Sequence, residues 1–301
     1  MAARGTSKNA ARYAQYVWGR EAGVLANIAR PLLFQTSPTP RLTGSVVVGI
    51  SQSGQSPDVI NVLRAALDQG QATIAFTNDV DSPLANVADV VVPLWAGVEL
   101  AVPSTKTLLT CLHTVVQVAE ALHPDPVRSS WIDQIPDFVE NAIGSAFAQR
   151  DGLTGVGECT ALTVLGRGTG YAAASELALK IREVTGMRAE SFSAPEFLHG
   201  PIGASGEGSL VWVVASPDQP EVYWAELVER LQQRGCVVTT LQPSSFARTA
   251  RTVIELPDQL PAWLFAILAT VYGQVASLLL GEKAGVDVDS PRGLRKITIT
   301  T

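Results

Sequence analysis

The sequence predicts an α/β chain of two tandem domains, each an open parallel sheet flanked by helices. Short apolar runs, typical of buried parallel strands, alternate with amphipathic helical segments. Two stretches of the first half also recur in the second at nearly the same offset: Arg4-Gly5-Thr6-Ser7 with Arg167-Gly168-Thr169-Gly170, and Val48-Gly49-Ile50-Ser51 with Val213-Val214-Ala215-Ser216. A repeat of this length in 301 residues indicates two duplicated domains of ordinary size.

The first domain is expected over residues 1–126. Its expected strands cover 45–50, 72–76 and 90–94, and its helices cover 57–69 and 105–122. By the repeat, this domain should begin with a strand equivalent to residues 162–166, but only Met1 to Arg4 precede Gly5. We therefore expect the first strand of the first sheet to be missing, through truncation or a start codon assigned too late.

A helical linker is expected over residues 127–150, followed by a second domain over 151–286 and a tail over 287–301. In the second domain, expected strands cover 162–166, 210–215 and 237–241, and expected helices cover 171–185, 221–234 and 263–280. We expect the tail, which has little periodicity, to lie over the active site.

Composition excludes several classes of function. The formal net charge is −6 and the basic residues are scattered, so no nucleic-acid surface is expected. Three widely spaced cysteines (Cys111, Cys159, Cys236) and three dispersed histidines fit a reducing cytoplasm and predict no metal or other cofactor. The longest apolar stretch, around 260–280, contains Tyr272, Gly273 and Gln274 and predicts a buried helix, not a membrane span.

The segment from Ser51 to Pro57 joins a buried strand to a helix and predicts a phosphate loop. Ser56 is a good N-cap and Pro57 a good first helical residue, and a helix N-terminus accepts anions. A plain polar turn would look similar, but the second half differs: its equivalent loop carries Asp218, whose carboxylate would repel phosphate. We therefore expect only the first half to hold a phosphate.

Lys180 and Glu183 stand three residues apart on one predicted helix, so they share a face. Most such pairs are surface salt bridges. Here the first half carries Val17 and Arg20 at the equivalent positions, so folding does not require the pair. Glu183 is our candidate for proton transfer between two carbons, a task that needs a carboxyl pKa raised toward the working pH.

His199 lies in a Gly-Pro-bounded loop three residues after Glu196, a better setting for proton transfer than that of the other histidines. Lys296 by itself looks like a solvated tail lysine. To attack a carbonyl it would need burial or nearby positive charge, which Arg292 and Arg295 could supply.

Taken in order, seven segments resemble the sugar isomerase (SIS) domain family, and most closely the isomerase half of the glutamine–fructose-6-phosphate aminotransferases. They are Gly5-Thr6-Ser7, Ser51–Ser56, Glu99–Lys106, Gly166-Arg167-Gly168, Ala178–Glu183, Glu196–Pro201 and Val286–Lys296. Together they span nearly the whole chain.

The resemblance implies roles for individual residues. Those that would hold the sugar phosphate are Ser51, Gln52, Ser53 and Ser56, with Thr6 and Ser7 nearby. Those that would line the sugar are Val102 and Ser104. Glu183 would move the proton between C1 and C2, with Lys180 near the sugar hydroxyls. His199, which in the aminotransferases comes from a partner subunit, would open the ring, and Lys296 would form a Schiff base with the open-chain ketose.

The resemblance also implies a homodimer that acts on a small sugar phosphate. We expect an amino-sugar 6-phosphate isomerase/deaminase that converts glucosamine 6-phosphate to fructose 6-phosphate and ammonia. Alternatives are a fructosamine-6-phosphate deglycase and the isomerase part of a glucosamine-6-phosphate synthase. In another class, the chain would be a non-catalytic sugar-phosphate sensor. The presence of Lys180, Glu183, His199 and Lys296 together favours an enzyme.

Overall fold

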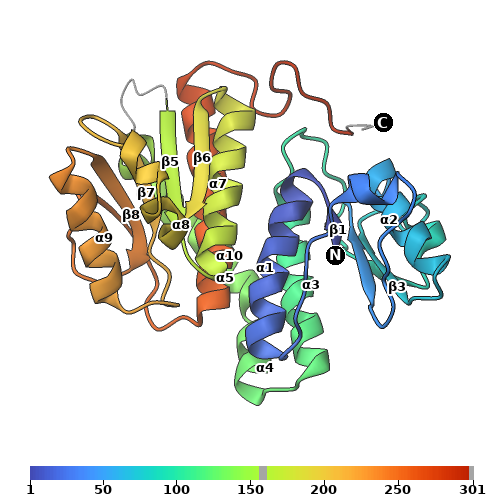
Figure 1. The fold of residues 1–301 in the computed structure, drawn as a ribbon. Coiled ribbons are helices and arrows are strands. Elements are labelled where there is room, and N and C mark those ends of the chain that lie inside the picture. The colour runs from blue at the N-terminus through green and yellow to red at the C-terminus, as the bar shows by residue number, and fades with distance from the viewer. Residues whose placement is uncertain (156–160, 298–301) are drawn as a thin grey trace. The chain divides into compact units, whose positions relative to one another are not determined.

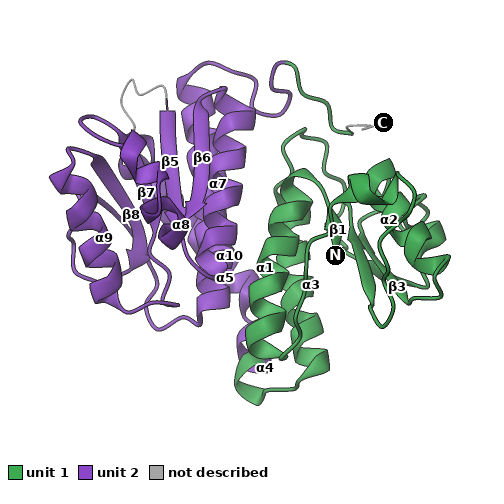
Figure 2. Cartoon of the chain, viewed as in Figure 1, with its two compact units in different colours: residues 1–128, 293–301 green, residues 129–292 purple. Residues whose placement is uncertain are grey.

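The computed structural model describes residues 1–155 and 161–297. Within them the chain forms two compact units, one of residues 1–128 with 293–301 and the other of residues 129–292 (Figure 2). Of the predicted tail, the part from Gly293 on thus belongs to unit 1. The helical linker predicted over 127–150 is helical, in α4 (Pro126–Ile132) and α5 (Ile135–Ala148), and from Ser129 on it belongs to unit 2.

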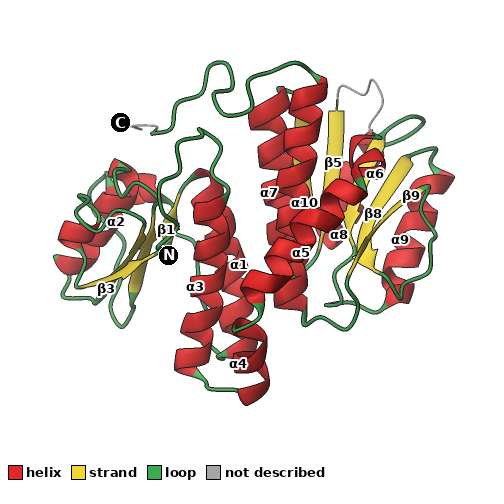
Figure 3. Cartoon of the chain, turned by 180° about the vertical axis from the view of Figure 1, so that it is seen from behind, coloured by secondary structure: helices red, strands yellow, loops and turns green. Residues whose placement is uncertain are grey.

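Unit 1 contains a four-stranded parallel sheet in the order β1-β2-β3-β4 (Figure 1). The strands are β1 (Ala2–Ala3), β2 (Val47–Ile50), β3 (Thr73–Thr77) and β4 (Val90–Pro93). The helices are α1 (Gly5–Glu21), α2 (Pro57–Leu67) and α3 (Lys106–Leu122), with short 3₁₀ turns η1 (Pro31–Phe34) and η2 (Ala85–Val87). Figure 3 shows α2 on one side of this sheet and α1 with α3 on the other.

The expectation that the first strand is missing is wrong. Ala2 and Ala3 form β1, which pairs in parallel with Gly49 and Ile50 of β2. Both alanines are buried, at 0% and 3% exposure. Two residues are too short for an apolar run to stand out, so the sequence pattern gave no sign of this strand.

Unit 2 contains a five-stranded parallel sheet in the order β6-β5-β7-β8-β9. Its strands are β5 (Ala161–Gly166), β6 (Arg188–Ser193), β7 (Leu210–Val214), β8 (Val237–Pro243) and β9 (Thr252–Leu256). Its helices are α5, α6 (Arg150–Thr154), α7 (Thr169–Thr185), α8 (Ala194–Leu198), α9 (Glu221–Gln233) and α10 (Ala262–Lys283), with the 3₁₀ turn η3 (Pro201–Ala204). Helix α10 packs against α7 and α5.

Helix α10 is long and apolar enough to cross a membrane, yet 89% of its most apolar window is buried inside the structure. A helix that is apolar on all sides belongs in a protein core. The prediction of a buried helix at this position is confirmed.

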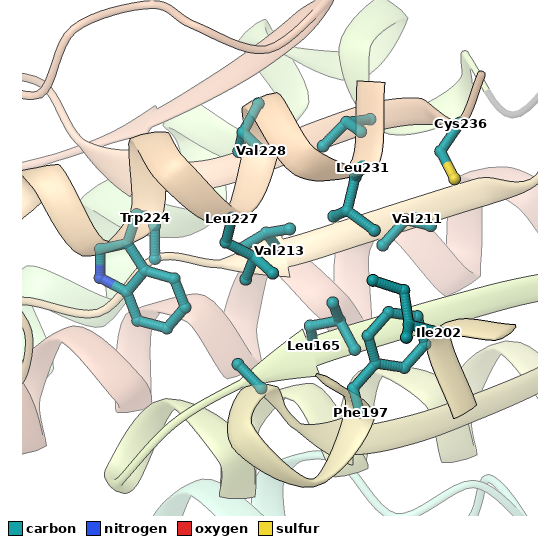
Figure 4. Packing of buried hydrophobic residues seen from close by; sticks show 13 residues of the cluster. Leu165, Phe197, Ile202, Val211, Val213, Trp224, Leu227, Val228, Leu231 and Cys236 are labelled. Atoms are coloured by element: carbon teal, nitrogen blue, oxygen red, sulfur yellow. The ribbon is translucent and has the colours of Figure 1, made fainter. Parts of the chain in front are cut away.

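The core between β5, β7, β8 and the helices α8 and α9 is shown in Figure 4. Trp224, Leu227 and Leu231 of α9 lie on one side of it, with Leu227 beside Val213 and Leu231 beside Val211 of β7. Each apolar side chain removed from water in this way contributes roughly 1.5–3 kcal/mol to the free energy of unfolding. The core therefore fixes α8, the short helix that precedes His199.

The two units repeat one order of elements, which fits the predicted duplication, although β1 and β9 were not predicted. β1, α1, β2 and α2 of unit 1 correspond to β5, α7, β7 and α9 of unit 2, and β3, β4 and α3 to β8, β9 and α10. Strand β6 has no counterpart among the described residues of unit 1 and was not predicted. It lies at the sheet edge and carries Arg188, Glu190 and several half-buried polar residues, so it lacks the apolar run of a central strand.

Candidate active site

The predicted phosphate loop follows the end of β2. Ser51 is tied to the sheet by its backbone N–H, which donates to the carbonyl of Phe76 at 3.0 Å. Ser56 is the N-cap residue of α2 and Pro57 its first residue, as predicted. The Ser56 hydroxyl makes no capping hydrogen bond within the described chain but lies 3.4 Å from the Ser51 hydroxyl. The two hydroxyls thus face each other at the positive end of a helix.

Gly54 is required at the turn of this loop. Its φ of 61° lies in the left-handed region, and a Cβ there would stand 1.9 Å from the Ser82 hydroxyl oxygen. Its carbonyl also accepts a hydrogen bond from the N–H of Leu84 at 3.0 Å. A side chain at position 54 would both strain the backbone and displace Ser82.

One pocket of unit 1 gathers several predicted binding residues. Thr6 and Ser7 from the first turn of α1, Gln52 from the phosphate loop and Ser104 from the segment before α3 all line it. Predicted residues outside its lining are Ser51, Ser53, Ser56 and Val102. The structure therefore brings together, within unit 1, residues that we predicted to bind the phosphate and to line the sugar.

Cys111 of α3 also lines this pocket. Burial raises the pKa of its thiol to about 12, so the thiol is protonated at neutral pH and is a poor nucleophile. Cys236 is likewise a free, buried cysteine, and Cys159 lies outside the described residues.

Lys296 of the tail lies in unit 1, where its amine donates to Glu99 Oε2 at 3.1 Å and to the carbonyl of Ala101 at 2.7 Å. The predicted sugar-lining residue Val102 is next in the chain. We did not predict a role for Glu99. Its place at the start of Glu99–Lys106, one of the segments that carry the family resemblance, was the available signal in the sequence.

In unit 2, Lys180 is buried in α7 between two carboxylates. Its amine lies 2.5 Å from Glu183 Oε2 and 3.3 Å from Glu176 Oε1, and its side chain is 1% exposed. Burial alone would lower the pKa of Lys180, but the charges of Glu176 and Glu183 outweigh it and raise that pKa. The predicted pair is therefore part of a buried cluster with Glu183 as its solvent-accessible end, since the Glu183 side chain is 24% exposed and that of Glu176 only 2%.

His199 is exposed and directly follows α8. Figure 4 shows Phe197 beside Ile202 and Leu165 in the core of unit 2. Because Phe197 and Ile202 flank His199 in sequence and are both buried, they hold the intervening turn while its imidazole faces solvent.

The loop of unit 2 that corresponds to the phosphate loop is closed by its own carboxylate. Asp218 Oδ2 accepts hydrogen bonds from the backbone N–H of Thr169 at 3.1 Å, from the Thr169 hydroxyl at 2.7 Å and from the Ser216 hydroxyl at 3.1 Å. Thr169 and Ser216 are the repeat equivalents of Thr6 and Ser51. The carboxylate of Asp218, which we expected to repel phosphate, therefore accepts hydrogen bonds from the donors of Thr169 and Ser216 that could otherwise bind an anion.

The described residues contain no group of three or more His, Cys, Asp or Glu side chains that could hold a metal ion.

Comparisons with known proteins agree on one family. The SIS domain model matches residues 1–121 and again 158–280. The glutamine–fructose-6-phosphate aminotransferase [isomerizing] of Aeropyrum pernix is 33% identical over 313 residues, which cover 98% of this chain and 50% of that protein. The chain thus spans about half the length of this relative.

Two solved structures share the fold. The C-terminal domain of glucosamine-fructose-6-phosphate aminotransferase from Francisella tularensis has a TM-score of 0.87 at 24% identity, over 96% of this chain and 85% of that one. Glucosamine-6-phosphate deaminase from Thermotoga maritima has a TM-score of 0.81 at 21% identity, over 99% and 89%. With its family model matched once in each half, the chain belongs to the SIS domain family, as a tandem pair of SIS domains.

Proposed function

We propose that this protein isomerises an amino-sugar 6-phosphate and releases ammonia, converting glucosamine 6-phosphate and water to fructose 6-phosphate and ammonia. The observation that carries the proposal is the pocket of unit 1, because Thr6, Ser7, Gln52 and Ser104 line it together. The hydroxyls of Thr6, Ser7 and Ser104 and the amide of Gln52 suit a phosphorylated sugar without basic side chains. The N-terminus of α2 at Ser56 lies outside this lining but on the same predicted phosphate loop as Gln52, and it suits an anion. The relatives named above support this choice, because one is named for fructose 6-phosphate and the other for glucosamine 6-phosphate.

The reaction needs no net oxidation. After ring opening, a base removes the proton from C2 of the open-chain amino aldehyde and a proton is delivered to C1. C2 is thereby oxidised and C1 reduced, which leaves an imine at C2. Water adds to the imine, the C–N bond breaks and ammonia leaves, so a ketose 6-phosphate remains.

In this proposal Glu183 moves the proton between C2 and C1. Its carboxylate is the accessible end of the buried cluster with Lys180, which keeps it oriented. His199 opens the ring, for which a solvent-accessible imidazole is suited. Lys296 lies beside Val102 on the loop that would line the sugar and is the candidate amine for the ketose carbonyl.

The test is turnover of glucosamine 6-phosphate by the purified chain, followed as fructose 6-phosphate and ammonia together. Glu183→Gln should lower kcat by about 10²–10⁴-fold, the usual contribution of a general acid or base, with little change in the melting temperature. Glu229→Gln, on the exposed surface of α9, is the matched control and should keep full activity. Turnover unaffected by Glu183→Gln would remove that residue from the mechanism.

The aminotransferase relatives favour a second candidate, the isomerase part of a glucosamine-6-phosphate synthase. The same chemistry then runs from fructose 6-phosphate and ammonia toward the amino sugar, so the assay is repeated in that direction. Turnover only of fructosamine 6-phosphates would instead show a deglycase. Stabilisation by sugar phosphates without turnover in any assay would show a sensor.

A further inference from the structure

Glu99 is a buried carboxylate that the reaction scheme above does not use. It lies in the segment between β4 and α3, with only 8% of the residue exposed. Its oxygens accept hydrogen bonds from the Ser104 hydroxyl at 2.9 Å, the Thr105 N–H at 2.9 Å and the Thr107 hydroxyl at 3.0 Å. The segment from Glu99 to Thr107 therefore forms a loop whose polar groups donate hydrogen bonds to the Glu99 carboxylate.

The carboxylate is ionised at neutral pH. Burial raises its pKa, but the hydrogen bonds from Thr105, Ser104 and Thr107 and the charge of Lys296 outweigh burial and lower the pKa to about 2. A buried anion of this kind attracts a cation strongly because little water screens it.

That cation is Lys296, which lies 197 residues further along the chain. Its amine bridges Glu99 Oε2 and the carbonyl of Ala101, and the side chain is 24% exposed where that of Glu99 is 2% exposed. Glu99 already receives several hydrogen bonds from its own loop, so it does not need the lysine to satisfy its oxygens. The lysine is the group whose position the contact determines.

The loop held by Glu99 is a wall of the candidate pocket. Ser104 and Thr107, whose hydroxyls bond Glu99, both line that pocket with Thr6 and Gln52. Glu99 thus contacts both Ser104, a residue of the pocket lining, and the amine of Lys296 in the tail.

We propose that Glu99 is a positioning residue that holds the amine of Lys296 against the sugar-lining loop. The loop and the amine then contact an entering sugar phosphate in a fixed arrangement. The role of Glu99 toward a sugar phosphate rests on the proposed function. Its contacts with Ser104 and Lys296 do not depend on that function. Glu99 touches no reacting atom in this scheme and acts through Ser104 and Lys296.

The experiment measures the reactivity of Lys296 in the full-length chain. Trace acetic anhydride labels accessible amines, and mass spectrometry gives the labelling of Lys296 relative to Lys283, an exposed lysine at the end of α10. In Glu99→Gln the amine loses its ion pair, so relative labelling should rise about fivefold, the effect of a modest ion pair. Glu255→Gln, which breaks a more exposed ion pair with Arg248, is the control and should leave the ratio unchanged.

The same variants are assayed for turnover, where Glu99→Gln should lower kcat/KM for the amino-sugar phosphate at least tenfold while Glu255→Gln does not. Unchanged Lys296 labelling in Glu99→Gln overturns the proposal, as does raised labelling with unchanged turnover. Raised labelling in a chain that turns over no sugar phosphate leaves the contact standing and overturns the proposed function instead. If Glu99→Gln does not fold, Glu99→Asp keeps the charge but shortens the reach, and the same rise in labelling is expected.

Discussion

Asp218 Oδ2 accepts hydrogen bonds from both the backbone N–H and the hydroxyl of Thr169, at the first residue of α7. In the repeat, Thr169 corresponds to Thr6, which lines the candidate pocket of unit 1. One SIS domain thus presents these groups to a pocket, and the other covers them with its own side chain.

Replacing Asp218 with alanine should lower the free energy of unfolding by about 1–3 kcal/mol, because Thr169 is buried and loses the carboxylate oxygen that accepts its two hydrogen bonds. Inorganic phosphate at millimolar concentration should then raise the melting temperature of the variant more than that of the wild type, since it can take the place of the carboxylate. Thermal unfolding with and without phosphate measures both effects. Asp258→Ala, which removes an exposed carboxylate bonded to Ser245, is the control. An equal phosphate effect in both variants contradicts the substitution of one anion for another.

Replacing Lys180 with methionine should destabilise unit 2 by about 3–5 kcal/mol, because it leaves the buried carboxylate of Glu176 without its cation. Urea denaturation gives the loss, and Lys283→Met at the exposed end of α10 should cost almost nothing by comparison. A Lys180→Met chain as stable as the wild type but inactive would mean that the lysine serves the reaction alone.

The stability of unit 1 should depend on acid through Glu99. Because folding lowers the pKa of Glu99 from 4.5 to about 2, its contribution is fully present above pH 4.5 and is lost as the pH falls toward 2. The shift corresponds to about 3 kcal/mol as an upper estimate. Glu99→Gln should therefore be less stable than the wild type at pH 7, and the difference should shrink between pH 4.5 and 2. A difference that stays constant over this range would show that Glu99 is not ionised in the folded chain.

If the protein is a homodimer and His199 acts across its interface, two inactive variants should complement each other. A His199→Ala chain and a Glu183→Gln chain, unfolded together and refolded, form mixed dimers in which one site keeps both side chains. Random mixing should restore about a quarter of wild-type turnover. Recovery should be absent if both residues of a site come from one chain. Size-exclusion chromatography of each variant checks that dimers form at all.

Much of the fold follows from patterns that the sequence carries openly. The central strands β2, β5 and β7 are short apolar runs, and the repeat of Arg4–Ser7 in Arg167–Gly170 predicted the two units. Strand β6 escaped because an edge strand with one solvated side has no such run. β1 escaped because it has only two residues.

Part of the candidate site could likewise be predicted from the sequence, and part could not. The loop from Ser51 to Pro57 is local, so its turn chemistry and helix N-cap could be predicted. Glu99 and Glu176 could not, because their importance comes from burial and from partners that the fold supplies. A carboxylate next to a lysine in space leaves no mark in the sequence when 197 residues separate the two.

The glycine at position 54 limits how this protein can change. The backbone there turns through a left-handed conformation with the Ser82 hydroxyl directly against its Cα. Any heavier residue would have to be matched by a second substitution at position 82, and the intermediate chain would carry a distorted loop. A change from Gly54 to another residue would therefore pass through an intermediate sequence with a distorted loop, so we expect single random substitutions to be rejected at this position.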